Sequence, residues 1–253
     1  LDEMLKGKLI NKAGEPVPLA QELYDLYQSE TEKGAIRIME DVLNGVSELH
    51  NRHFVHRDID PSNVMITNDG HIKVIDFGIA KNLNKPDTTF LVSEDKTKSG
   101  ARMGKMAYAA PELITGKIEL HNPSSDVYSL GIMMYQLLVG TVPFTGSEVE
   151  VIQSQVHTPV PVNKIANHDL RRIVKKATGK EQSLRYQDAA EMLEDLSKVK
   201  LSKSRRGAGT TTGDLTPEPT PAPGSFPVWG YWLAAALSTI LGAVVGLLTI
   251  SIE

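Results

Sequence analysis

Residues 56–78 read HRDIDPSNVMITNDGHIKVIDFG, and this stretch decides the fold. Within it, two short apolar runs that contain β-branched residues, Val64–Ile66 and Ile72–Ile75, are separated by an Asn-Asp-Gly sequence at residues 68–70. A turn sequence of this kind between two such runs is a strong local signal for a β-hairpin. If the turn is centred on residues 68–70, antiparallel pairing places Asn63 close to opposite Asp76. The hairpin is therefore expected to bring an amide and a carboxylate together at its open end.

That pair of side chains has the chemistry of a magnesium site. Asn63 and Asp76 both offer hard oxygen ligands, and Mg²⁺ takes few protein ligands and completes its shell with water and phosphate oxygens. Asp58 lies on the short loop just before Asn63 and can face the same ion from the other side. Taken alone, Asp58 is also explained as an aspartate that caps a turn.

Most of the remaining sequence up to residue 199 has helical periodicity. Apolar residues at helical spacing predict an amphipathic helix from about Thr31 to His50, with a shorter helix before it near residues 19–27. Residues 126–139 are apolar on nearly all sides, which predicts a helix buried in the middle of the domain. Asp188 and Glu191 form a capping-box-like start for a last helix. The expected fold class is mainly α with a small β-hairpin.

Composition narrows the function classes. The 253 residues are 41% apolar and 23% charged, which a folded globular core requires. A net charge of −4 argues against nucleic acid as a partner, because nucleic-acid binders need a basic face. The absence of cysteine excludes disulfides, thiolate zinc sites and a cysteine nucleophile. His50, His53 and His71 have no metal-ligand pattern and are expected to be solvated.

The composition changes at Lys198. A basic cluster, residues 198–206, gives way to Gly, Thr and Pro, which predicts a linker over residues 200–227. Residues 228–252 carry no charge and, at about 1.5 Å per residue, exceed the roughly 30 Å core of a bilayer. We expect a single transmembrane helix there rather than a buried core helix. Residues 1–199 are expected to be cytoplasmic, because the basic cluster precedes the helix on the side where Trp229, Tyr231 and Trp232 mark its start. Gly242 and Gly246 have the small-xxx-small spacing that allows a homodimer.

Four motifs occur in a fixed order along the chain: His56-Arg57-Asp58 with Asn63, then Asp76-Phe77-Gly78, then Ala110-Pro111-Glu112, then residues 126–131. Any one of them occurs by chance, but the ordered set resembles the signature of bacterial-type Ser/Thr protein kinases. The resemblance covers roughly residues 1–199 and implies the C-terminal lobe of the kinase fold. Nothing before Asp58 resembles the glycine-rich loop over ATP or the strand lysine of the N-terminal lobe. We therefore expect this chain alone to lack the nucleotide half of the site and to be inactive.

The resemblance implies transfer of the ATP γ-phosphate to Ser or Thr hydroxyls of protein substrates. In this reading Asp58 accepts the hydroxyl proton, while Asn63 and Asp76 hold Mg²⁺ on the phosphates. Arg57 would meet a phosphate on the activation segment, for which Thr88, Thr89, Ser93, Thr97 and Ser99 are the candidate acceptors. Asp126 would bind backbone amides of the catalytic loop, and Glu112 would pair with Arg185. The residues with structural or regulatory roles would be His56, Arg57, Phe77, Gly78, Glu112, Asp126 and Arg185.

Two positions depart from the family pattern. Asp60 stands where Ser/Thr kinases usually carry a lysine aimed at the transferred phosphate, and Lys105 stands in a Gly-Lys-Met sequence where Gly-Thr-Pro is usual. One interpretation is that the chain is a pseudokinase scaffold that binds protein partners without phosphotransfer. The favoured one is that the cation has moved, so that Lys105 supplies the charge that Asp60 does not. The predicted catalytic residues are therefore Asp58, Lys105 and Asn63.

Overall fold

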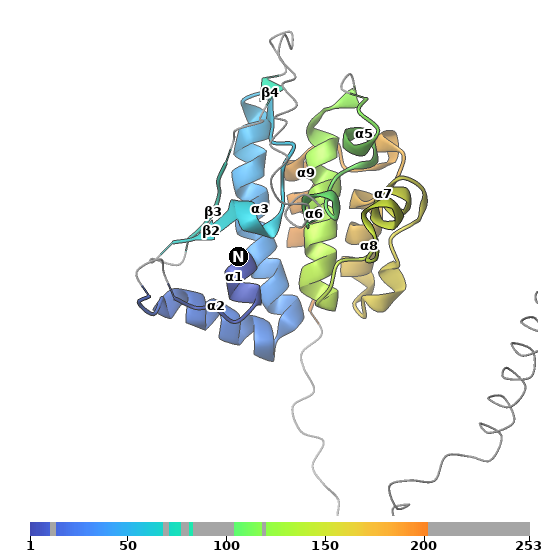
Figure 1. Ribbon diagram of the computed structural model, residues 1–253. Helices are drawn as coiled ribbons and strands as arrows, with labels where there is room; N and C mark the ends of the chain where they lie inside the picture. The colour runs from blue at the N-terminus through green and yellow to red at the C-terminus, as the bar shows by residue number, and fades with distance from the viewer. Residues whose placement is uncertain (11–13, 68–70, 77–80, 83–103, 118–119, 202–253) are drawn as a thin grey trace, which may run out of the picture. The chain divides into compact units, whose positions relative to one another are not determined.

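The computed structural model describes residues 1–10, 14–67, 71–76, 81–82, 104–117 and 120–201 (Figure 1). Within these ranges the chain is mainly helical, with two small antiparallel sheets. The helices and strands are α1 (Asp2–Leu5), α2 (Pro18–Ser29), α3 (Thr31–Asn51), β1 (Phe54–Val55), β2 (Val64–Ile66), β3 (Ile72–Val74), β4 (Lys81–Asn82), α5 (Pro111–Ile114), α6 (Pro123–Val139), α7 (Glu148–His157), α8 (His168–Ala177) and α9 (Ala189–Ser197). Short 3₁₀ turns lie at Pro61–Asn63, Val162–Lys164 and Gln182–Leu184.

The core is built around α3 and α6. Helix α3 buries the middle of the predicted stripe, at Met39, Val42, Leu43 and Val46, and α6 is buried on nearly all sides, as predicted. Helix α6 runs through the middle of the domain, with α3 on one side and α8 on the other (Figure 1). Asn122 begins α6 with a capping box to Ser125, and Gly140 ends it in the left-handed conformation at φ 86°.

The predicted hairpin is present as β2 and β3, which pair with Val64 opposite Val74. The turn at residues 68–70 lies outside the described residues. A second sheet, in which β1 pairs with β4, was not predicted, because two-residue strands are too short to show an alternating pattern. The loop that carries Asp58 runs between β1 and β2, so both sheets fix its ends.

Helix α9 begins close to the helix start predicted at Asp188. The Asp188 carboxylate accepts the Glu191 N–H at 2.8 Å, which is one half of a capping box. The Glu191 carboxylate accepts the N–H of Gln187 instead of that of Asp188, so the second half of the prediction is wrong by one residue.

Across the described part of the chain, no helix is both long and apolar enough to cross a membrane. Residues 202–253, which include most of the predicted linker, the predicted transmembrane helix and the Gly242 and Gly246 pair, lie outside that part.

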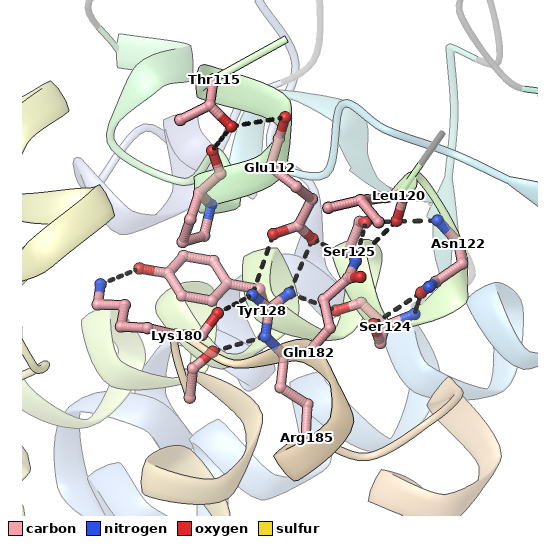
Figure 2. A network of polar contacts seen from close by, with 12 residues as sticks. Glu112, Thr115, Leu120, Asn122, Ser124, Ser125, Tyr128, Lys180, Gln182 and Arg185 are labelled. Carbon is pink, nitrogen blue, oxygen red and sulfur yellow. Dashed lines mark hydrogen bonds and ion pairs between the residues drawn. The ribbon is translucent and has the colours of Figure 1, made fainter. Parts of the chain in front are cut away.

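A buried ion pair joins α5 to the segment before α9 (Figure 2). Arg185 binds both carboxylate oxygens of Glu112, at 2.8 and 3.0 Å, and its N–H groups also donate to the carbonyls of Ser124, Gly179 and Lys180. Burial alone raises the pKa of Glu112, but hydrogen bonding and the charge of Arg185 outweigh it and hold the pKa below its ordinary value. The guanidinium is therefore satisfied on all sides.

Lys180 lies beside this pair and points at the Tyr128 hydroxyl, 2.7 Å away (Figure 2). Burial, with a smaller contribution from the charge of Arg185, lowers the pKa of Lys180 to about 8. Keeping the Lys180 side chain charged in the folded protein therefore costs free energy that a fully solvated lysine does not lose.

Glu112→Gln should lower the free energy of unfolding by about 3–5 kcal/mol, because it leaves the Arg185 charge buried without its partner. The matched control is Glu194→Gln, which removes an exposed carboxylate 2.7 Å from Lys198 and should change stability by no more than about 0.5 kcal/mol. Urea denaturation of both variants measures the difference, and equal effects would contradict a structural role for the buried pair.

Stability should also rise with pH through the range in which Lys180 loses its proton. The folded pKa of about 8 lies below the ordinary value of 10.5, so between these values the unfolded chain binds more protons and the free energy of unfolding increases with pH. Denaturation of the wild type and of Lys180→Met at pH 7.5 and 9.5 tests this. The increase should be smaller in Lys180→Met, and an identical increase in both proteins would show that Lys180 is not its source.

Candidate active site

Two side chains from distant parts of the sequence meet at the Asp58 carboxylate. The Asn63 amide nitrogen donates to Asp58 Oδ2 at 3.1 Å and to the Asp58 carbonyl at 2.7 Å. The Lys105 ammonium, 47 residues further along the chain, donates to the same Oδ2. The Asp58 side chain is 18% exposed, so it is partly open to solvent while two donors hold it in place. These three residues are the ones that the sequence predicted as catalytic.

Asn63 and Asp76 lie close together across the hairpin. The Ile75 N–H donates to the Asn63 carbonyl at 2.8 Å, so the backbone ladder of β2 and β3 continues beyond the strands themselves. Asn63 therefore faces Ile75 and is one residue out of register with Asp76. Asp76 is exposed and has a φ of 64°, in the left-handed region that a non-glycine residue rarely adopts.

The donor set at this end of the hairpin fits Mg²⁺. Because the Asn63 amide nitrogen faces Asp58, its Oδ1 is the atom on the opposite side that can act as a ligand. In the described ranges, no three His, Cys, Asp or Glu side chains lie close enough together to hold a metal ion by themselves. One amide oxygen and one carboxylate are nevertheless sufficient for Mg²⁺, which keeps most of its water and phosphate ligands.

The buried carboxylate of Asp126, on α6, anchors the loop that carries Asp58. It accepts the backbone N–H groups of His56 and Arg57 at 2.7 and 2.8 Å. Arg57 has a φ of 69°, so its bond to Asp126 holds a backbone conformation that costs roughly 1–3 kcal/mol. The side chain of Asp126 thereby fixes the direction in which the chain enters Asp58.

His56 connects this loop to the hairpin. Its Nδ1 accepts the Asp58 N–H at 3.3 Å, and its Nε2 lies 3.2 Å from the Ile75 carbonyl. Since a backbone N–H can only donate, we assign the proton to Nε2, which then donates to Ile75. One buried imidazole therefore sets Asp58 relative to the residue just before Asp76.

The expectation that His50 is solvated is wrong. His50 is 8% exposed, its Nε2 lies 3.0 Å from Asp126 Oδ2, and its Nδ1 accepts the N–H of Ala189 at 3.2 Å. These contacts span 76 and 139 residues of sequence, so no local pattern reveals them. A histidine on the buried stripe of α3 was the available signal. His53 and His71 are exposed, in agreement with the prediction.

Lys105 faces several carboxylates. Burial lowers its pKa, but the hydrogen bond to Asp58 and the charges of Asp58, Asp60 and Asp76 together raise the pKa above its ordinary value. Asp60 itself is buried and turns toward its own backbone, where it accepts the N–H of Ser62 at 2.6 Å and caps the 3₁₀ turn that follows. The Lys105 ammonium is thus a positive group placed among these acidic side chains.

Two cavities open beside Lys105. A cavity of about 160 Å³ is lined by Asp58 and Lys105 together with apolar side chains such as Met106 and Leu113. A larger one of about 470 Å³ is lined by Asp60, Lys105 and Tyr108. Asp58 and Lys105 are therefore accessible to a bound molecule.

The other predicted residues divide into two groups. Glu112 and Arg185 belong to the buried network of Figure 2 and form no direct contact with Asp58 among the described interactions. Phe77, Gly78 and the candidate phosphate acceptors at residues 88–99 lie outside the described residues.

Comparison with known proteins identifies the family of the chain. Residues 15–208 match the protein kinase domain family. The chain is 31% identical to serine/threonine-protein kinase PknA of Corynebacterium glutamicum, over 89% of this chain and 52% of that protein. It is 32% identical to probable serine/threonine-protein kinase PknB of Lactococcus lactis, over 68% of this chain and 27% of that protein, and 36% identical to PrkC of Bacillus subtilis, over 65% and 24%. The chain spans between about a quarter and a half of these relatives. On the match to residues 15–208, the chain belongs to the protein kinase domain family.

Proposed function

We propose that the protein is a Ser/Thr protein kinase, which transfers the γ-phosphate of ATP to Ser or Thr hydroxyls of protein substrates. The observation that carries this proposal is that Asn63 and Lys105 both donate hydrogen bonds to the carboxylate of Asp58. The similarity to bacterial proteins named as serine/threonine-protein kinases supports it.

In this proposal Asp58 is the base that accepts the proton of the substrate hydroxyl as the new O–P bond forms, while the bond from the γ-phosphorus to the bridging oxygen breaks and ADP leaves. Asn63 and Asp76 would hold Mg²⁺, which supplies positive charge against the phosphate oxygens. The hydrogen bonds that Asn63 donates to Asp58 support the assignment of the base, since they orient its carboxylate while leaving it partly exposed.

Lys105 is proposed as the cation that replaces the lysine usual at the position of Asp60. Its contact with Asp58 supports this role, because a side chain that reaches the base also reaches the atoms that the base acts on. The capping interaction of Asp60 with Ser62 supports it further, since Asp60 is turned toward the protein and its charge is partly satisfied there.

Lys105→Ala should lower the transfer rate by about 10²-fold while ATP binding changes less, because the contact strengthens as charge shifts in the transition state. The measurement is steady-state transfer to a protein substrate by a protein in which a nucleotide-binding lobe precedes Leu1. Asp58→Ala is the positive control and should lose about 10²- to 10⁴-fold.

The double variant Asp60→Lys with Lys105→Thr should recover part of the loss, because it restores the usual family arrangement. Recovery will be incomplete, since removal of the Asp60 cap costs about 1 kcal/mol. Unchanged kinetics in Lys105→Ala together with a severe loss in Asp58→Ala would show that Lys105 is an ordinary surface lysine.

A pseudokinase scaffold is the second candidate. The direct contact of Lys105 with Asp58 favours it, because an ammonium on the carboxylate competes with a substrate hydroxyl. If the wild type with both lobes transfers no phosphate under conditions in which it binds ATP and Mg²⁺, the scaffold replaces the kinase as the proposed function.

We further propose that the protein is anchored in a membrane by residues 228–252, with the kinase lobe in the cytoplasm and with pairing through Gly242 and Gly246. The uncharged run and the basic cluster before it support this topology. A reporter that works only outside the cytoplasm should be active when it is fused after Glu253. Activity of a reporter that works only in the cytoplasm, fused at the same place, would overturn the topology. Recovery of the protein in the soluble fraction would overturn it as well.

A further inference from the structure

A buried glutamine on α7 binds the backbone next to Lys105. Gln155 is 0% exposed, and its amide nitrogen donates to the carbonyl of Ala107 and, at 3.4 Å, to that of Met106. Its amide oxygen accepts the hydroxyl of Tyr128 at 2.5 Å. The hydrogen bonds of this side chain are therefore directed at residues 106–107 and at Tyr128.

Lys180 fixes the direction of these hydrogen bonds. Its ammonium donates to the Tyr128 hydroxyl oxygen at 2.7 Å and to the Gln155 carbonyl at 2.6 Å (Figure 2 shows the first contact). Because an ammonium has no acceptor, the Tyr128 hydroxyl must accept from Lys180 and donate to Gln155. That donation requires the Gln155 oxygen to face Tyr128, so its NH₂ group faces the carbonyls of Met106 and Ala107.

The two carbonyls that Gln155 binds, those of Met106 and Ala107, belong to the turn that carries Lys105. The Tyr108 N–H donates to the Lys105 carbonyl at 3.1 Å, and the Ala109 N–H donates to the Met106 carbonyl at 3.3 Å. A shift of residues 106–107 therefore moves the Lys105 backbone as well, and with it the ammonium that reaches Asp58.

We propose that Gln155 is a positioning residue, oriented by Tyr128 and Lys180, which holds the turn at residues 105–109 so that Lys105 reaches Asp58. The effect of this positioning on catalysis rests on the proposed kinase function, but the positioning itself does not. The alternative is that the three side chains merely satisfy one another in the core.

Amide hydrogen exchange in the full chain distinguishes these two roles. Tyr128→Phe removes the hydroxyl alone and should accelerate exchange of the Tyr108 and Ala109 amides by at least about 10-fold. Amides in the middle of α3, such as those of Val42 and Leu43, should keep their rates. Gln155→Glu is the second variant: it retains the size of the side chain and an acceptor for Tyr128, but turns an acceptor toward the Ala107 carbonyl, so it should have the same local effect.

Lys176→Met is the matched control. Lys176 also lies over a tyrosine ring, 3.9 Å from the centre of Tyr186, and its ion pair, at 2.9 Å, is with Glu191 on α9 rather than with the turn at residues 105–109. Its substitution should leave the Tyr108 and Ala109 amides unchanged, whereas Lys180→Met should accelerate them.

Equal acceleration at all amides in Tyr128→Phe and Gln155→Glu would reduce the three residues to a structural role and overturn the proposal. Unchanged exchange at Tyr108 and Ala109 would overturn it as well. Local acceleration without any loss of transfer rate in a protein with both lobes would uphold the positioning and count against a catalytic role for Lys105.

Discussion

The Asp126 carboxylate receives the N–H groups of His56 and Arg57 and lies 3.0 Å from the imidazole of His50, while it is only 1% exposed. A carboxylate in this position is tolerated only because donors replace its water, so the loop and the carboxylate require each other. Since Asp126 is on α6, the helix buried on nearly all sides, the loop takes its position from the most buried part of the core. The positions of Asp58 and, through His56, of the end of β3 follow from this interaction.

Local pattern predicted the parts of the fold that depend on near neighbours in sequence. The stripe of α3, the uniformly apolar α6 and the hairpin of β2 and β3 were all visible, because each is repeated within a few residues. The contacts of His50 and Gln155 were not, because they join residues between 27 and 139 positions apart. The hairpin register was predicted to within one residue, and only the ladder bonds fix it.

The candidate site likewise combines a contact between near neighbours in sequence with a contact between distant residues. Asp58 and Asn63 are five residues apart, and their meeting is a property of one short loop. Lys105 reaches the same carboxylate from a turn that α7 holds through Gln155, so its place depends on helix packing rather than on the motif. A cation supplied by the catalytic loop itself would be fixed by that loop alone. A cation supplied by residues 104–109 reaches Asp58 only when that turn is in place, so the contact between Lys105 and Asp58 depends on the position of the turn.

His50 connects the start of α9 to the carboxylate that supports the loop of Asp58. Its Nδ1 accepts the N–H of Ala189, the first residue of α9, and its Nε2 reaches the carboxylate that holds the loop. A force that unwinds α9 from its first turn therefore reaches the Asp126 carboxylate through two successive hydrogen bonds and the loop through a third. The backbone that leads into Asp58 is thereby connected to the start of α9, although the two are far apart in sequence.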